Sequence, residues 1–347
     1  MAGGPTTPAL VSAAAAAGGM GFLAAGYQSV DTLHNDITEI RSAGTGLFGV
    51  NLFITRYDDA RSATSDDEIT GFSRTLSDIA ESAGLDGPAP ASFTDNDYAG
   101  KVHYLCNTPV PMVSFTFGVP NAGTVDRLHE AGTEVAVMIT SAEDARTARE
   151  NGADILIAQG TQAGGHQSTF SIGDGPGQSS TLELLKDVTS SLPDVPVIAT
   201  GGIHTAADAH AALDDGAAAV QLGTALLNTQ EAGTSAAHRA GLVRHFGTHG
   251  QSRTEFTRGF SGRPARSVVN KFVEDTRDAP AAYPYNNEMT KPLRASAKKK
   301  SPDDGAEYVA LWCGEPLSER ENAPAGFLDG GSLASVFAQI TTGTDAR

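Results

Sequence analysis

Residues 195–227 read VPVIATGGIHTAADAHAALDDGAAAVQLGTALL, and this stretch is the most informative one for the fold class. A short β-branched run ends in a pair of glycines, an alanine-rich segment of helical period follows, and a second short run ends in Gly223–Thr224. Short apolar strands that alternate with helices are typical of a parallel sheet covered on both faces. The stretch therefore predicts a βαβ unit of an α/β protein.

The same alternation extends through the first two thirds of the chain. Seven apolar runs are predicted as strands: 20–25, 48–54, 111–117, 134–139, 153–159, 195–200 and 218–222. A closed TIM (β/α)8 barrel, the fold class that this pattern predicts, has eight strands. Residues 8–17 already have helical period, so we expect the first strand of the barrel to be missing from this chain, upstream of Met1.

Two segments depart from the alternation. Residues 56–105 are more polar, with helical patterning at 69–83, and predict an insertion beside the barrel mouth. After the last predicted strand the period breaks down, and residues 230–265 are expected to be helical and then looped. We therefore predict a barrel core over residues 1–230, followed by a C-terminal helical and loop extension over residues 231–347 that packs at the barrel mouth.

Composition excludes several classes of partner. The 347 residues carry a net charge of −17, whereas nucleic-acid binding needs a cationic face. The longest apolar run is too short to span a membrane, and the N-terminus lacks the cationic start of a secretion signal. Cys106 and Cys313 are predicted to be free thiols, and the histidines show no metal-ligand spacing. We expect a cytoplasmic protein with no metal and with no nucleic-acid or membrane partner.

Two glycine turns predict a phosphate site. Gly201–Gly202 and Gly223–Thr224 follow the last two predicted strands, where many barrels hold a phosphate on backbone N–H groups and a helix N-terminus. Such a site needs no lysine, which suits an acidic protein. The alternative is that these glycines only allow strands and helices to pack closely. His204 and His210 follow in the turn and the helix, and we expect both at the surface.

Residues 152–168, GADILIAQGTQAGGHQS, place a histidine just after a buried strand. The strand ends at Gln159, and a glycine-rich turn leads through Gly164 and Gly165 to His166. The carboxyl ends of the strands form the active face of a barrel, and glycines there let the backbone approach a flat ligand. Histidine titrates near neutral pH and serves in proton transfer. The pattern predicts an active-site histidine; the alternative is a structural loop with an exposed histidine.

Taken together, these motifs resemble the nitronate monooxygenase family, once called 2-nitropropane dioxygenases. The resemblance spans nearly the whole chain, and the segments that carry it are MAGGPTTP (1–8), GVNLF (49–53), AQGTQAGGH (158–166), ATGGI (199–203), QLGTALL (221–227), SGRPAR (261–266) and YPYNNEMTKPLRA (283–295). It implies a barrel that binds FMN without a covalent bond. The implied reaction is oxidation of alkyl nitronates, or of nitroalkanes, with O2 to carbonyl compounds and nitrite.

The resemblance also implies roles for single residues. The residues implied to hold the FMN phosphate, or to line that pocket, are Gly201, Gly202, Gln221, Leu222, Gly223 and Thr224. Those implied to lie near the flavin ring are Met1, Ala2, Gly3, Asn51, Gln159, Gly164 and Gly165. The catalytic histidine of the family corresponds to His166. Tyr283 and Lys291 are expected to reach the barrel mouth and contact the substrate.

The chemistry of His166 has two interpretations at this point. A protonated His166, aided by Lys291, would attract an anionic nitronate, whereas a neutral His166 would abstract the α-proton of a neutral nitroalkane. Two other functions also remain open. One is an NAD(P)H-dependent flavin reductase of enoyl-thioesters or quinones on the same architecture, and the other is a flavin-free phosphate-binding barrel enzyme.

Overall fold

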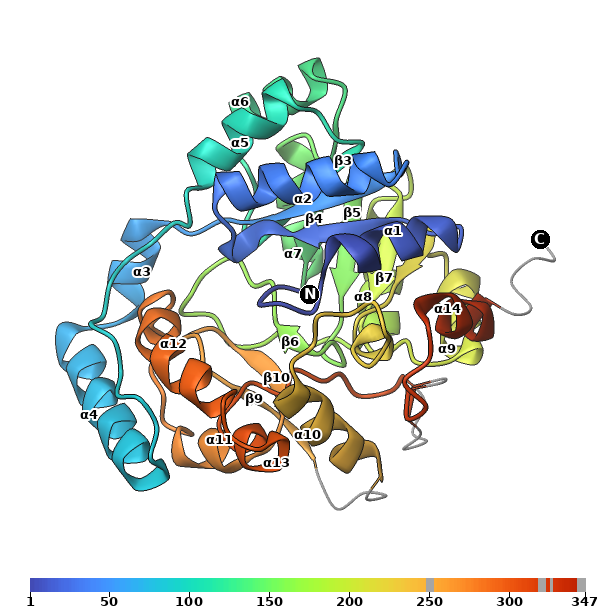
Figure 1. The fold of residues 1–347 in the computed structure, drawn as a ribbon. Coiled ribbons are helices and arrows are strands. Elements are labelled where there is room, and N and C mark those ends of the chain that lie inside the picture. Colours follow the sequence, from blue (N-terminus) through green and yellow to red (C-terminus); the bar gives the residue numbers. More distant parts are fainter. Residues whose placement is uncertain (248–252, 318–322, 325–326, 342–347) are drawn as a thin grey trace.

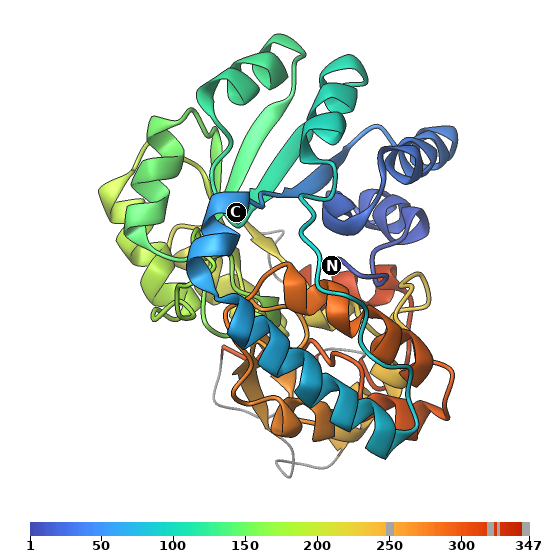
Figure 2. The same ribbon diagram turned by 90° about the vertical axis from the view of Figure 1, so that its left-hand side faces the viewer.

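Seven parallel strands form one curled sheet (Figures 1 and 2). The computed structural model describes residues 1–247, 253–317, 323–324 and 327–341. In spatial order the strands are β1 (Gly21–Ala24), β2 (Phe48–Phe53), β3 (Met112–Thr116), β4 (Glu134–Ile139), β5 (Ile155–Gln159), β7 (Val197–Thr200) and β8 (Ala219–Gln221). All seven predicted strands are confirmed, and the curled, parallel arrangement is that of a TIM-type barrel.

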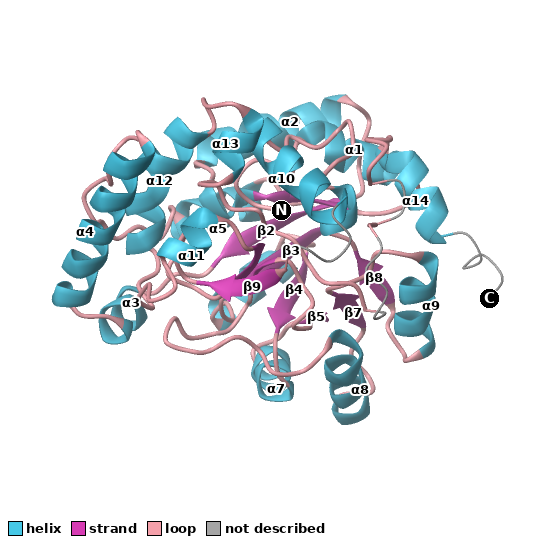
Figure 3. Ribbon diagram, turned by 90° about the horizontal axis from the view of Figure 1, so that it is seen from below, coloured by secondary structure: helices cyan, strands magenta, loops and turns pink. Residues whose placement is uncertain are grey.

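The sheet is open between β1 and β8. Among the described residues no strand pairs with the outer side of either one, so the eighth barrel position is unfilled. Helix α14 (Leu333–Thr341) packs against both α1 (Pro8–Ala16) and α9 (Ala206–Asp214), as Figure 3 shows. Its side chains Val336 and Ile340 join the main hydrophobic core. The ring of helices is thus continued beside the gap in the sheet.

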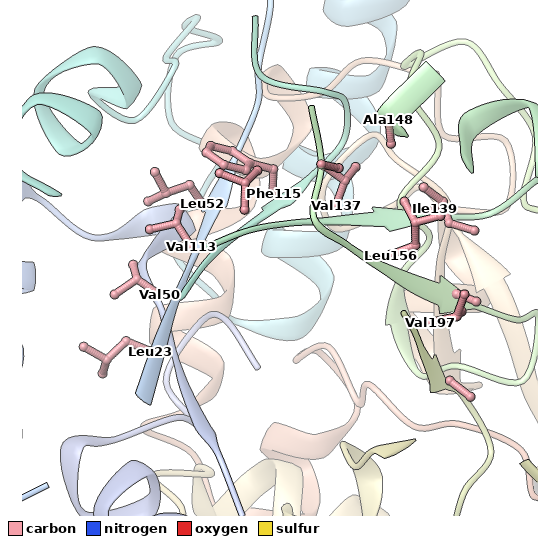
Figure 4. Close-up of a cluster of buried hydrophobic side chains, with 14 of the residues drawn as sticks. Leu23, Val50, Leu52, Val113, Phe115, Val137, Ile139, Ala148, Leu156 and Val197 are labelled. Atoms are coloured by element: carbon pink, nitrogen blue, oxygen red, sulfur yellow. The ribbon is translucent and has the colours of Figure 1, made fainter. Parts of the chain in front are cut away.

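The main core lies between the sheet and the surrounding helices (Figure 4). Strand register places Leu23, Val50 and Val113 in one row across β1, β2 and β3, and all three are at most 1% exposed. Burial of each such side chain contributes about 1.5–3 kcal/mol. The covering helices are α2 (Val30–Ser42), α5 (Tyr98–Asn107), α6 (Ala122–Glu130), α7 (Ala142–Glu150) and α8 (Thr181–Ser191). No described helix has the length and apolar character that crossing a bilayer requires.

The insertion after β2 forms α3 (Tyr57–Ala63) and the longer α4 (Asp66–Ala83), which confirms the predicted helical patterning. Helix α4 begins at a capping box in which Ser65 and Glu68 each accept a hydrogen bond from the other's backbone N–H. Its buried face packs against α12 (Tyr285–Ala297), so insertion and C-terminal extension lie side by side (Figures 1 and 2).

The prediction of helix and then loop for residues 230–265 holds for α10 (Ala236–Gly247) and for the loop 258–264, lies outside the described residues at 248–252, and is wrong at 254–257 and at 265, which are strand. After α10, strands β9 (Thr254–Thr257) and β10 (Ala265–Val268) form an antiparallel sheet with β6 (Gly165–His166). Strands of four residues are too short for a clear alternating pattern, and β6 lies far away in the sequence. The remaining helices of the extension are α11 (Lys271–Asp275) and α13 (Pro302–Ala306).

Candidate active site

A cavity of about 680 Å³ lies at the carboxyl ends of the strands. Its volume is typical of sites for small molecules and cofactors. The predicted site residues that line it are Met1, Ala2, Gly3, Asn51, Gln159, Gly164, Gly165, His166, Gly201, Gly202, Gln221, Leu222, Gly223, Thr224 and Lys291. The fold therefore brings fifteen of the sixteen predicted residues to one place, and Tyr283 is the exception.

One end of the cavity has the features of a phosphate cup. Gly201 and Gly202 have φ of +117° and +72°, a region that favours glycine. No hydrogen bond within the described residues uses the backbone N–H of Gly202, Ile203, Gly223 or Thr224. Unpaired N–H groups are rare in protein interiors, so a group of four that lines a cavity indicates an anionic ligand.

The first residues of α9, Ala206 and Ala207, do not line the cavity. The Asp208 carboxylate accepts hydrogen bonds from the N–H groups of His204 (3.1 Å) and Thr205 (2.9 Å), the two residues that precede the helix. His204 itself is only 2% exposed, so the prediction of a surface residue is wrong. His210 is half-buried and does not line the cavity.

The turn that carries His166 is clamped from two sides. In β6, His166 pairs with Ala265 of β10. On the other side Gln159 donates from Nε2 to the His166 carbonyl oxygen and accepts from the Ser168 N–H, both at 2.8 Å. Both polar ends of the Gln159 side chain are thus bound to the turn. Gln159 also lines the cavity, so its place near the flavin ring stays a prediction. The hydrogen bonds show in addition that its side chain orients the turn that carries His166.

We expect Gln159→Met to destabilise the protein. The substitution keeps the side-chain length but leaves the His166 carbonyl and the Ser168 N–H without their partner, at a cost of about 1–3 kcal/mol each. Urea unfolding measures the loss in free energy. Gln178→Met, which removes a hydrogen bond from an exposed side chain, is the control and should change stability little. Equal stability of Gln159→Met and the parent would contradict the clamp.

The ring of His166 is held by a hydroxyl and by aromatic neighbours. Its Nε2 lies 2.8 Å from Ser261 Oγ, and the ring centroids of Phe117 and Trp312 lie 5.6 and 5.3 Å away. Burial lowers the pKa of His166 to about 3, with further lowering by the cations Arg263 and Arg294. The neutral imidazole is therefore the form present near pH 7.

Three residues around His166 were not predicted. Ser261 and Arg263 lie in the SGRPAR segment, and the Arg263 guanidinium carbon lies 4.3 Å from the centroid of Phe117. Phe117 has φ of +75°, an uncommon conformation for an aromatic residue, and such strain concentrates at functional sites. The segment was noted as a family motif, but its sequence alone carries no sign of contact with β6.

The two predicted substrate residues differ in position. Tyr283 is fully buried, with its ring centroid 5.5 Å from that of Phe117, and it does not line the cavity. Lys291 lines the cavity and pairs with Glu288 at 2.6 Å. Arg294 of the same helix, α12, and Lys298 at its C-cap line the same cavity. Their spacing of three and seven residues from Lys291 places all three on one helical face, and this spacing is visible in the sequence.

Acid should destabilise the ligand-free protein through its buried histidines. Burial lowers the pKa of His166 to about 3, and of His204 and His238 to about 4, against 6.5 in an unfolded chain. As pH falls below 6.5 the unfolded state binds these protons while the folded state does not, so stability decreases. The limiting slope is about 1.4 kcal/mol per pH unit for each histidine. Urea unfolding between pH 5 and 7.5 tests this, since it avoids most carboxyl titration.

His238→Gln is the matched variant for this measurement. It removes one titrating ring and should reduce the slope of unfolding free energy against pH by up to about 1.4 kcal/mol per pH unit. A free energy of unfolding that stays constant from pH 7 to pH 5 would contradict the buried, neutral histidines.

A curled parallel sheet, with a cavity lined by unpaired N–H groups after its last two strands and by a half-buried histidine after β5, is the arrangement of a cofactor-binding barrel enzyme. The family model described as nitronate monooxygenase matches residues 1–326. A probable nitronate monooxygenase of Staphylococcus aureus (strain JH9) is 30% identical over 320 residues, covering 90% of this chain and 86% of that protein. The chain belongs to the nitronate monooxygenase family, and is a flavin oxidoreductase of this type.

Solved structures agree with this assignment. The nitroalkane oxidase from Streptomyces ansochromogenes has a TM-score of 0.85 and 37% identity, covering 100% of this chain and 95% of that one. FabK from Thermotoga maritima has a TM-score of 0.68 and 24% identity, covering 99% of this chain and 89% of that one. The likeness to FabK shows the shared fold alone.

Proposed function

We propose that this protein oxidises alkyl nitronates, and the corresponding nitroalkanes, with FMN and O2, giving a carbonyl compound and nitrite. The observation that carries the proposal is that one cavity holds both the phosphate cup and a neutral His166. Family membership and the likeness to a nitroalkane oxidase support the same substrate class.

The residues of the cavity fit FMN. Its phosphate would accept from the four free N–H groups of the cup. The buried Oε1 of Gln221 has no partner among the described residues and could accept from the ribityl chain. Asn51 donates from Nδ2 to Ser114 Oγ (3.0 Å) and Thr116 Oγ1 (2.9 Å), so its carbonyl oxygen is not used in these bonds and is left to accept from an N–H of the ring. When bound, FMN supplies the electron transfer from substrate to O2.

The role of His166 in this proposal follows from its protonation state. The neutral ring is the form that can accept a proton, so we assign His166 as the general base that removes the α-proton of a nitroalkane, a role in which the anion that forms beside the ring must raise its pKa. The lowered pKa of His166 disfavours the alternative of a protonated His166 that attracts nitronate. Ser261, 2.8 Å from Nε2, orients the ring.

The positive charge that an anionic nitronate needs comes from α12. Lys291, Arg294 and Lys298 line the cavity, and the buried Nε of Arg294 has no partner among the described residues. In a protein with net charge −17 such a local group of cations is needed to attract an anion. Lys291 is already paired with Glu288, so we assign the larger share of this attraction to Arg294 and Lys298.

Substrate mixing with the FMN-reconstituted protein tests the proposal. Under anaerobic conditions propionate 3-nitronate should bleach the visible flavin absorbance, and in air it should give nitrite with consumption of O2. NADPH in a separate anaerobic mixture should leave the flavin oxidised. Rapid bleaching by NADPH, without reaction with the nitronate, would instead establish a reductase. Failure to bind FMN at all would overturn the flavin assignment for this chain.

A further inference from the structure

His204 is a buried histidine that the reaction proposed above does not use. It lies two residues after Gly202, is 2% exposed, and lines the cavity. Neither of its ring nitrogens has a hydrogen-bond partner among the described residues. Its one close ring contact in the described structure is with Phe246 at the end of α10, at 6.4 Å between ring centroids.

Burying both ring nitrogens without a partner lowers the stability of the protein, unless a bound ligand forms hydrogen bonds with them. A neutral imidazole carries one N–H donor and one acceptor nitrogen, and leaving a buried polar group unpaired costs about 1–3 kcal/mol. The ring lines the same cavity as the four free N–H groups of the cup. It is also the only titratable side chain in the two cup segments, Gly201–His204 and Gln221–Thr224.

The start of α9 leaves a place for a side-chain donor. In many phosphate sites the N-terminus of a helix supplies donors and partial positive charge. Here the N–H groups of His204 and Thr205 are bound to Asp208, and the first helical residues, Ala206 and Ala207, do not line the cavity. The side chain of His204 does line it and is placed to supply a donor from the same turn.

We propose that His204 completes the phosphate cup, donating a ring N–H to the phosphate of the bound flavin and so making the protein select FMN over riboflavin. The inference rests on the flavin-binding part of the proposed function and extends it to a residue of this chain that distinguishes a phosphorylated ligand from an unphosphorylated one.

The charges around the ring give a second expected property. Burial lowers the pKa of His204 to about 4, Asp208 of α9 opposes this lowering, and His245 of α10 adds to it. A phosphate dianion beside the ring would favour its protonated form. We therefore expect FMN binding near pH 6 to take up a proton at His204, with riboflavin causing no such uptake.

Flavin titrations of the apoprotein, followed by the quenching of flavin fluorescence, test the proposal. His204→Phe keeps an aromatic ring against Phe246 but removes the donor, and should weaken FMN binding about 10- to 100-fold while leaving riboflavin binding unchanged. His204→Gln, which retains a donor, should recover part of the FMN affinity. His210→Phe is the matched control, because His210 is half-buried on α9 and does not line the cavity.

The outcomes separate the two proposals. If the parent protein binds neither flavin, the proposed function fails. If the parent protein binds FMN and His204→Phe binds it equally well, the role of His204 is overturned while the flavin proposal stands. Equal weakening of FMN and riboflavin would assign His204 a packing role and also overturn it. Because the phosphate itself has a second pKa near 6 and can release a proton on binding, the comparison is between proteins: calorimetry in two buffers of different ionisation enthalpy should show more proton uptake with FMN in the parent protein than in His204→Phe.

Discussion

Replacing His166 by alanine is expected to lower kcat for a nitroalkane by about 10²- to 10⁴-fold, the usual contribution of a general base. The ring is neutral near pH 7 and lines the cavity, and Ser261 Oγ orients it at 2.8 Å. Because the phosphate cup lies in separate turns, FMN should remain bound. Steady-state kinetics and the visible flavin spectrum of the same preparation give both quantities.

The choice of substrate makes this experiment sharper. A nitronate has already lost its α-proton, so His166→Ala should slow nitronate turnover less than turnover of the matching nitroalkane. Equal losses for the two substrates would mean that His166 acts on the anion instead of removing a proton. An unchanged rate with both would exclude His166 from catalysis. His103→Ala, which alters an exposed histidine of α5, is the control and should behave as the parent protein.

Gly202→Ala is expected to damage both stability and flavin binding. At φ of +72° a residue with a Cβ is strained by about 1–3 kcal/mol. The added Cβ would also lie 2.6 Å from the Glu315 carbonyl oxygen and 3.0 Å from the Leu317 nitrogen. To relieve this clash, either the Gly201–Gly202 turn or the segment 315–317 must move. The two are joined by a hydrogen bond of 2.9 Å from the Leu317 N–H to the Gly202 carbonyl oxygen, so a shift of one disturbs the other. We expect at least about a tenfold loss of FMN affinity.

A glycine elsewhere provides the control for Gly202. Gly71 lies within α4, where an added Cβ meets no atom within 4 Å. Gly71→Ala should raise the free energy of unfolding by about 0.5–1 kcal/mol and leave FMN affinity unchanged. Urea unfolding and flavin titration of both variants complete the comparison. Normal FMN binding by Gly202→Ala would show that the phosphate lies elsewhere.

The barrel strands were predictable because their local signal is strong. Runs such as 134–139 and 195–200 are mostly apolar and rich in β-branched residues, as expected of strands buried on both faces. Strands β9 and β10 were missed because their stability comes from pairing with each other and with β6, which no local pattern reports. Polar residues such as Thr254 and Arg266 within them further weaken any strand signal.

The site was predictable where its chemistry depends on backbone, and less so where it depends on side-chain partners. Glycine turns after successive strands were expected to lie together, and they do line one cavity, whereas their role in holding a phosphate stays a prediction. The sequence could not show that Gln159 would be bound to the His166 turn. Nor could it show that a histidine after a glycine turn would be enclosed instead of solvated, since the covering Phe246 lies more than forty residues further on.

The pairing of β6 with β10 has a consequence for how the enzyme forms during synthesis. His166 and Ala265 are separated by roughly a hundred residues, and closing so long a loop is slow and entropically costly. The main core likewise includes Val336 and Ile340 of α14, near the end of the chain. A nascent chain that ends before β10 therefore lacks the partner strand of His166, and the active centre can be completed only after most of the extension has been made.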